Sequence, residues 1–375
     1  MKIRKDQWIC VIAFCLFLGV MSALYLLLPK ATYSETEKRE LEKAPVLTLD
    51  TLASGKFGEN VDDYMADHIP GRDFLVGLNA YVDLYTGRQV TKDIYLTEDQ
   101  RLVEAPAVWD QQQAQKNVTA VNKFAQILDK TVHFMVVPSG GWAVEGTVKG
   151  LADPYYDPEL IQKLYAMAGE GVSCLDVVPT FEAVPDKASL YFKTDHHWTS
   201  LGAYTAYAFL MEQLEMSYPA REEFTVKTVE DFKGSTHSRA ALWMIPGEPL
   251  EMWERSRDLQ VTNAKSDQVH AGVFYAERLA EADKYTVFLD GNHSVVRIDN
   301  PENVGKGKLL VIRDSYSNCL GCFLAESYET VVLVDLRYIN NEVISQLDTQ
   351  YDFDHVLVCY SLGNFLTDNN LFKLK

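Results

Sequence analysis

The sequence predicts an α/β protein built on a mostly parallel β-sheet with helices on both faces, together with an N-terminal transmembrane helix. Short apolar runs alternate with segments of helical periodicity over residues 110–214 and again over 308–359. Strands linked by crossover helices give this rhythm. The uncharged apolar run from Trp8 to Leu28 is long enough to span a bilayer. With 375 residues, the chain can hold an anchor and one large domain.

The basic residues Lys2, Arg4 and Lys5 precede the apolar run. Positive flanks stay on the cytoplasmic side, so we expect residues 1–29 to anchor a single-pass protein of the cell membrane. The N-terminus would be cytoplasmic and the rest of the chain extracellular. A cleaved signal peptide is the alternative, but its apolar core is usually about 7–15 residues. The only small-residue cleavage site, Ser22-Ala23, lies inside the run.

The net charge limits the possible partners, and the cysteine content argues against disulfide bonds and redox chemistry. The net charge of −18 argues against nucleic acid and against an anionic lipid surface, since both require a basic face. Of the six cysteines, Cys10 and Cys15 lie in the anchor, and the other four are too scattered for a disulfide framework. Cys319 and Cys322 have redox-motif spacing without an aromatic-rich turn before them, which favours two small buried side chains.

Residues 30–87 are predicted to form an exposed stalk and two short helices broken at Pro70-Gly71. A charged group at this break (Asp67, His68, Arg72 and Asp73) has two interpretations. It contributes to a site, or it is a solvated helix junction. We favour the junction, and hence a linker with a docking segment.

Residues 88–375 are predicted to form the main domain. Apolar residues at Val118, Val121, Ala125 and Leu128 follow the period of an amphipathic helix within 110–130. The same reasoning predicts helices at 158–170 and 201–214, the latter capped by Ser200, and strands at 132–138, 172–177, 309–312, 331–336 and 355–359.

The region from about 221 to 301 is less regular, and we interpret it as an insertion. YTVFLDGN followed by SVVRI suggests a β-hairpin in it. Because the insertion separates two candidate site motifs, Trp243, Trp253 and His237 are candidates for a roof over the site. Packing in irregular segments is the alternative for the tryptophans.

The first motif is YFKTDHHWTS, which places an acid, two imidazoles and an indole at Asp195 to Trp198. A carboxylate beside a histidine fixes its tautomer and stabilises the imidazolium formed in proton transfer. In an extended segment Asp195 and His197 share a face and His196 points away. One alternative is a strand end with hydrogen-bonded histidines. Another is a zinc or iron site, but the N-terminal third lacks the further acidic ligands, so we expect no metal and no cofactor.

The second motif is KLLVIRDSYSN, in which an apolar strand stops at Arg313-Asp314 and a helix can begin after Ser315. A serine at a strand-to-helix turn lies beside backbone N–H groups that can hold an oxyanion. Ser315 is therefore the candidate nucleophile for the pair Asp195 and His197. Chain order does not oppose this, because triads differ in order between folds.

TDHHWTSLGAY and LLVIRDSYSN together resemble the DHHW family of bacterial surface proteins, which are similar to the SGNH-type domains of alginate O-acetyltransferases. DHIPGRD, FLDGN and VDLRYI match the same pattern. The resemblance implies an SGNH-hydrolase-like, flavodoxin-like sheet and a triad of Asp195, His197 and Ser315. Arg313 stands where GDS-type esterases have a small residue.

The resemblance also suggests further site residues. Asn292, after Gly291 in FLDGN, is either an amide donor to the oxyanion or an ordinary turn residue. Arg313, Trp198 and His196 are additional candidates for contact with substrate or oxyanion, and His196 is expected to support the site from outside it.

The expected function is extracytoplasmic, serine-dependent transfer of an acetyl group to a cell-surface polysaccharide through an acyl-enzyme. Because acetyl-CoA is absent outside the cell, the resemblance implies a membrane partner of the MBOAT type as acyl donor. A carbohydrate O-acetyl esterase with the same chemistry is one alternative. A non-catalytic glycan-binding component of the envelope is another.

Overall fold

The computed structural model describes residues 5–374 except 35, 89, 92, 149–150, 152, 256, 265–267, 340–346 and 348. The chain divides into two compact units. One holds Met1–Gly87 and Ser238–Trp243, and the other holds Arg88–His237 and Met244–Lys375.

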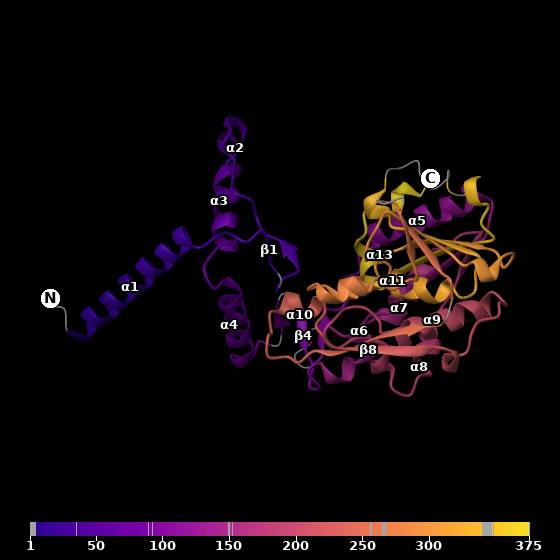
Figure 1. The fold of residues 1–375 in the computed structure, drawn as a ribbon, viewed down its shortest axis with the longest axis horizontal. Coiled ribbons are helices and arrows are strands. Elements are labelled where there is room, and N and C mark those ends of the chain that lie inside the picture. Colours follow the sequence, from indigo (N-terminus) through magenta and orange to yellow (C-terminus); the bar gives the residue numbers. More distant parts are fainter. Residues whose placement is uncertain are drawn as a thin grey trace. The chain divides into compact units, whose positions relative to one another are not determined.

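The first unit begins with helix α1 (Lys5–Leu27), drawn in indigo in Figure 1. Its segment Trp8–Leu27 is long and apolar enough to cross a membrane, and none of it is buried. This is a sign of a single-pass anchor, although a signal sequence would share these properties. The unit also contains β1 (Tyr33–Ser34), β2 (Arg39–Glu40), α2 (Leu49–Ala53), α3 (Lys56–Asp67) and α4 (Arg72–Tyr85). The predicted break at Pro70-Gly71 is confirmed, since Gly71 caps α4 with a φ of 71°.

The second unit is organised around an eight-stranded sheet of order β11-β10-β12-β14-β13-β15-β6-β7. The five strands from β14 to β7 are parallel, and β10, β11 and β12 extend one edge in antiparallel pairing. The mostly parallel sheet was predicted, and its antiparallel edge was not. The strands are β6 (Val132–Val137), β7 (Val172–Cys174), β10 (Gln260–Asn263), β11 (Val269–Ala271), β12 (Val295–Asp299), β13 (Lys308–Arg313), β14 (Thr330–Val334) and β15 (His355–Ser361).

Helices cover both faces of this sheet, as Figure 1 shows for α5 and α11. The connection from β13 through α11 to β14 runs toward one edge, and the connection from β6 through α7 to β7 runs toward the other. Right-handed crossovers in opposite directions place their helices on opposite faces. The main helices of this unit are α5 (Gln111–Leu128), α7 (Asp157–Tyr165), α9 (Ser200–Gln213), α11 (Ser317–Leu324) and α13 (Leu362–Thr367).

Shorter elements surround the sheet. β3 (Val90–Thr91), β4 (Ile94–Leu96) and β5 (Leu102–Glu104) form a small sheet, and β8 (Thr225–Phe232) pairs with β9 (Glu248–Glu254). The remaining short helices are α6 (Gly140–Ala143), α8 (Val178–Glu182) and α10 (Ser235–Ala240).

Two local predictions were wrong. The cap of α9 is Thr199, whose side chain accepts a hydrogen bond from Gly202 N, whereas Ser200 is the first helical residue. The hairpin predicted around FLDGN does not form, because Lys284–Val287 is a 3-10 turn and Leu289, Asp290 and Gly291 all have positive φ. Positive φ is incompatible with a strand. The following strand β12 pairs with β10 and β14 instead.

Candidate active site

The DHHW segment is a bent loop closed by a bridge between Tyr191 and Trp198. The Glu248 carboxylate fixes the loop by accepting hydrogen bonds from Lys193 N, Thr194 N and Thr194 Oγ1, at 2.6–2.7 Å. The predicted extended conformation of this segment was therefore wrong. The bend turns neighbouring side chains toward a common centre.

A continuous chain of hydrogen bonds joins Asp195, His197 and Ser315. The His197 ring lies with Nε2 2.7 Å from Ser315 Oγ and Nδ1 2.5 Å from Asp195 Oδ1. All three residues are buried, and Ser315 is the most accessible of them at 8% exposure. Ser315 lies two residues beyond the end of β13, at the carboxyl edge of the parallel strands and next to the point where strand order reverses between β13 and β15. Ligands of open α/β sheets bind at this position.

The Asp195 carboxylate is held in its ionised form. Burial alone raises its pKa, but the adjacent His197 and His196 and the hydrogen bonds from His197 and Ser235 N hold the pKa well below its usual value. Ser235 N donates to Asp195 Oδ2 at 2.6 Å, and His197 N donates to Oδ1 at 2.9 Å. An ionised aspartate in this place can orient His197 and stabilise its protonated form.

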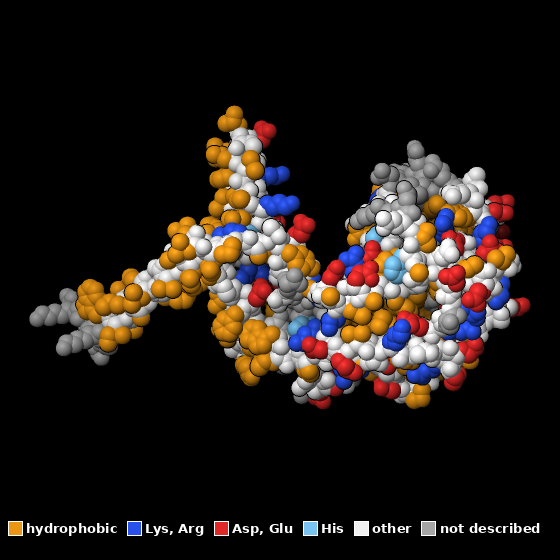
Figure 2. Space-filling model, in the orientation of Figure 1, with side chains coloured by type: hydrophobic (Ala, Val, Ile, Leu, Met, Phe, Trp, Pro, Cys, Tyr) orange, Lys and Arg blue, Asp and Glu red, His pale blue; other side chains and the backbone are white. Residues whose placement is uncertain are grey.

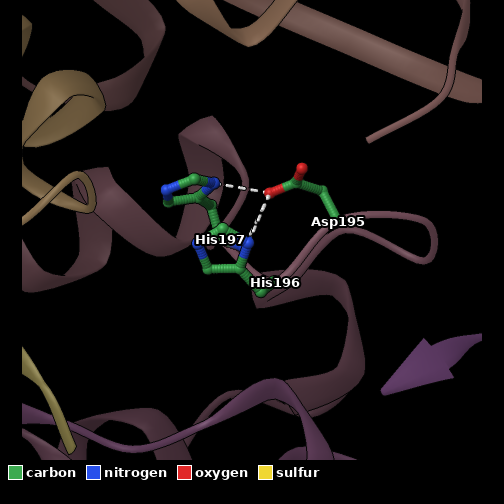
Figure 3. A group of neighbouring side chains, drawn as sticks. All are labelled: Asp195, His196 and His197. Atoms are coloured by element: carbon green, nitrogen blue, oxygen red, sulfur yellow. Dashed lines mark hydrogen bonds and ion pairs between the residues drawn. The ribbon is translucent and has the colours of Figure 1, made fainter. Parts of the chain in front are cut away.

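His196 does not point away from the site, contrary to the prediction. Its ring centroid lies 3.8 Å from that of His197, and its Nδ1 lies 3.7 Å from Asp195 Oδ1 (Figure 3). The same Nδ1 lies 2.5 Å from Ser235 Oγ. Burial and the neighbouring His197 lower the pKa of His196. His196 therefore lies beside the Asp195 and His197 pair, while His197 makes the bond to Ser315.

Two tyrosines complete the packing around the imidazoles. Tyr285 stacks on the His197 ring, with centroids 3.9 Å apart and planes at 7°. Tyr316 donates its hydroxyl hydrogen bond to His196 O and accepts at its carbonyl from Trp198 Nε1, 3.0 Å away. Trp198 is fully buried, so its indole supports the loop and does not present itself to substrate.

The turn that carries Ser315 is fixed by the preceding Asp314. One carboxylate oxygen accepts from Ser361 N, Ser361 Oγ and Asn364 Nδ2 at 2.8–2.9 Å, and the other accepts from Tyr316 N at 3.0 Å. Asp314 thus ties the turn after β13 to the turn between β15 and α13.

Arg313 and Asn318 orient the side chain of Asn292. Arg313 Nη1 and Asn318 Nδ2 both donate to Asn292 Oδ1, each at 3.1 Å. Arg313 also donates to Asn318 Oδ1 at 2.6 Å. Arg313 and Asn318 are fully buried, whereas Asn292 is exposed. With its oxygen engaged by two donors, the Asn292 amide can present only its nitrogen as a further donor.

The loop before Asn292 has an unusual backbone. Leu289, Asp290 and Gly291 follow one another with φ of 56°, 64° and 77°. Left-handed conformations at residues other than glycine cost about 1–3 kcal/mol each and occur often at functional sites. The Asp290 carboxylate holds the loop through Arg278 Nε at 2.5 Å and His293 Nε2 at 3.0 Å.

The candidates for a roof over the site have other positions. Trp253 is buried among aromatic side chains, including Phe323 and Tyr204. Trp243 belongs to the first unit, where it packs on Phe74 and Tyr81. His237 is buried and its backbone N–H donates to Thr194 O. The contacts of the two tryptophans involve no residue of the triad, whereas His237 bonds to Thr194, beside Asp195.

The other candidate groups are structural. Cys319 and Cys322 are buried free thiols on α11, and burial raises the pKa of Cys319 to about 12, which opposes redox reactivity. Asp67 and His68 lie in the first unit, where Asp67 accepts both terminal nitrogens of Arg39 at 2.9 and 2.5 Å.

Asp195, His196 and His197 are close enough to hold a metal ion, since one ligand atom of each lies within 4.8 Å of the others. Figure 3 shows the Asp195 carboxylate on one side of the two neighbouring rings, with a nitrogen of each ring facing it. Both ring nitrogens of His197 are, however, already engaged by Asp195 and Ser315. A metal bound at His197 Nδ1 would displace the hydrogen bond between this nitrogen and Asp195. The arrangement of donors and acceptors therefore favours proton transfer over metal ligation.

A serine, a histidine and an aspartate joined at the carboxyl edge of an α/β sheet define a protein with the arrangement of a hydrolytic triad. The DHHW protein family matches residues 107–334, and the chain belongs to this family. No curated protein sequence matches the chain.

Solved structures share the fold. A DHHW family protein from Eubacterium siraeum superposes with a TM-score of 0.65 at 19% identity, covering 76% of this chain and 95% of that one. PatB1 from Bacillus cereus, solved with a sulfonyl adduct, gives a TM-score of 0.64 at 22% identity, covering 76% of this chain and all of the other. The O-acetyltransferase domain of Pseudomonas putida AlgJ is more distant, with a TM-score of 0.45 that is too low to bear on function.

Proposed function

We propose that this protein is a serine-dependent acyltransferase that moves an acetyl group onto a cell-surface polysaccharide outside the cell. The observation that carries the proposal is the hydrogen-bond chain from Asp195 through His197 to Ser315. A non-catalytic glycan-binding component of the envelope would have no need for this chain.

In the first half of the reaction, Ser315 Oγ attacks the carbonyl carbon of the acyl donor while His197 Nε2 takes the serine proton. The tetrahedral intermediate then collapses, the bond to the leaving group breaks, and His197 returns the proton to that group. Ser315 is left as an acetyl ester. Asp195 orients His197 and stabilises its positive charge in both proton transfers.

In the second half, a sugar hydroxyl attacks the acetyl ester and gives its proton to His197. Collapse releases the acetylated sugar, and Ser315 recovers its proton. If water attacks instead, the same steps make the protein a carbohydrate O-acetyl esterase. The acceptor alone therefore separates the two functions.

Asn292 is the proposed oxyanion donor. Its amide oxygen is engaged by Arg313 and Asn318, which leaves Nδ2 to stabilise negative charge on the carbonyl oxygen. Gly291 adopts the left-handed conformation that glycine favours, and Asn292 follows it at the end of the loop Leu289–Gly291.

The proposal extends to location and partner. The apolar helix Trp8–Leu27 would anchor the protein, with the basic N-terminus in the cytoplasm and the catalytic domain outside. Acetyl groups would reach that side through a membrane acyl donor protein of the MBOAT type.

Transfer is tested with an activated acetyl ester as donor and an oligosaccharide as acceptor. We expect acetylated oligosaccharide from the wild type and none from Ser315→Ala. Free acetate without acetylated sugar would favour the esterase, and neither product from folded protein would contradict acyl transfer.

A further inference from the structure

Helix α4 carries an apolar stripe that the described residues of its own unit leave exposed. Leu75, Leu78, Val82 and Tyr85 are between 42% and 82% exposed. Their spacing of three, four and three residues places them on one face of the helix. An amphipathic helix normally turns such a stripe toward a core. Here the stripe requires a cover from outside the unit.

The stripe is distinct from the packing face of α4. Gly77 and Ala80 are buried, and Trp243 packs so closely on Gly77 that a side-chain carbon there would lie 1.9 Å from its ring. Helix α4 therefore has a packed apolar face and a second, uncovered one.

The neighbouring helices continue this exposed apolar surface. Among the described residues 42–79, no apolar side chain is buried. Exposed members are Val46, Leu47, Leu49 and Leu52 at α2, and Met65 and Ile69 at the end of α3. Within this unit, Figure 2 shows apolar side chains along α2 and α3 on the side from which α1 extends, and charged side chains on the other.

Hydrogen bonds hold the junction of α3 and α4 close to the end of α1. Helix α1 ends at Leu27, and Lys30 Nζ donates to Tyr25 O at 2.5 Å. His68, which follows α3, lies with Nε2 3.1 Å from Ala31 O. Asp67 accepts from Glu42 N at 2.9 Å as well as from Arg39. The charged cluster at the helix break is thus a clamp on the chain that leaves α1.

We propose that α2, α3 and α4 lie on the outer surface of the lipid bilayer, with the apolar stripe in its interfacial layer. This inference rests on the proposed membrane anchor, because a membrane-spanning α1 places the clamped junction within a few residues of the bilayer. Helices with one apolar and one charged face bind in the plane of this layer.

The charge of this region specifies the kind of lipid surface. Residues 30–87 contain eleven acidic and six basic residues, so attraction to anionic lipid does not drive binding. Burial of the apolar side chains does. A neutral phosphatidylcholine bilayer should therefore be a sufficient partner.

The test uses the full chain in phosphatidylcholine vesicles, with Cys10, Cys15 and Cys174 replaced by serine. A single cysteine at Leu78 or Met65 carries a polarity-sensitive fluorophore. Cysteines at Glu59 and Asp63, exposed on the charged side of α3, are the matched controls. We expect brominated lipid to quench the Leu78 and Met65 probes at least about threefold more than the control probes, because only the former contact acyl chains.

Each outcome bears on the proposal. Equal quenching at the four positions would overturn it. If the probe at position 78 is shielded from water in native membranes but not in pure lipid vesicles, the surface binds a neighbouring membrane protein. That result would also overturn the proposal. Flotation of the protein with the vesicles tests the anchor separately, and turnover of an acetyl ester in the same vesicles tests the catalytic site. A failure of the anchor or of the catalytic site can therefore be told apart from a failure of the surface proposal.

Discussion

His197 engages both of its ring nitrogens, and this determines its chemistry. With Nδ1 on the Asp195 carboxylate, the neutral ring carries its proton there and presents Nε2 as an acceptor to the Ser315 hydroxyl. His196 uses Nδ1 toward Ser235 and has no such bond to Ser315. We therefore propose that His197 is the base and that His196 supports it.

Replacing His197 by alanine should lower the turnover of an activated acetyl ester by about 10⁴-fold, because the serine loses its base. Adding Ser315→Ala should reduce turnover little further, since both changes disable one step. His196→Ala should keep roughly a tenth or more of the activity, because its ring makes no bond to the nucleophile. Loss of activity in His196→Ala with retention in folded His197→Ala would reverse the two assignments.

Asn292→Ala should lower kcat by about 10²-fold with a small change in KM, because an oxyanion donor acts in the transition state. Steady-state kinetics with the same ester measures this effect. The side chain is exposed, so the thermal unfolding midpoint should stay close to that of the wild type. An unchanged kcat would make Asn292 an ordinary turn residue.

The position of the nucleophile depends on how β13, its turn and α11 are fixed to the neighbouring strand. Asp314 provides this connection through Ser361 and Asn364. Asp314 therefore joins the turn after β13 to the turn after the adjacent strand β15. We therefore expect the turn that carries Ser315 to unfold only together with the central strands of the sheet.

Asp314→Ala should lower the free energy of unfolding by about 3 kcal/mol or more, because several buried donors lose a charged acceptor. Asp352→Asn is the control, since this side chain is 96% exposed, it pairs with Lys130, and its φ of 48° suits asparagine as well as aspartate. It should change the free energy of unfolding by no more than about 0.5 kcal/mol. Urea unfolding of the detergent-solubilised chain measures both. Similar losses in the two variants would contradict the role given to Asp314.

Buried histidines make the stability of the folded protein depend on pH. Burial lowers the pKa of His133, His196 and His355. In the unfolded chain these groups titrate near about 6.5. Below that pH the unfolded state binds more protons than the folded state, so the stability present above pH 6.5 is lost as pH falls through the lowered values.

The urea midpoint should therefore be lower at pH 5 than at pH 7.5, and a His133→Gln, His355→Gln variant should reduce this difference. Comparison with the variant isolates the histidines, because burial raises the pKa of Glu248 and Glu326 and gives them the opposite sign. The two histidines are a natural pair, with rings 6.0 Å apart. An identical pH dependence in wild type and variant would contradict the account.

The sequence predicted the parts of the molecule that depend on local pattern. Continuous apolar runs identified β6, β13, β14 and β15, and the DHHW and RDSYSN motifs pointed to Asp195, His197 and Ser315, which hydrogen bonds join in the structure. The antiparallel edge strands β10 and β11 were missed because they are short and their pairing is set by tertiary contacts, and β12 was expected from SVVRI but with another partner. Tyr285 and Ser235 were missed for the same reason, since both reach the imidazoles from the irregular insertion. Asn318 did carry a signal, as it lies within RDSYSN.

Acyl transfer requires Ser315 to be an activated nucleophile, and covalent labelling measures this. A sulfonyl fluoride should add one group to the wild-type chain, detected by intact mass and located at Ser315 by peptide mapping. Ser317→Ala, a change two residues away in the same motif, should still react, whereas Ser315→Ala should not and His197→Ala should react far more slowly. No adduct at Ser315, or an equal rate of labelling in His197→Ala, would contradict the account.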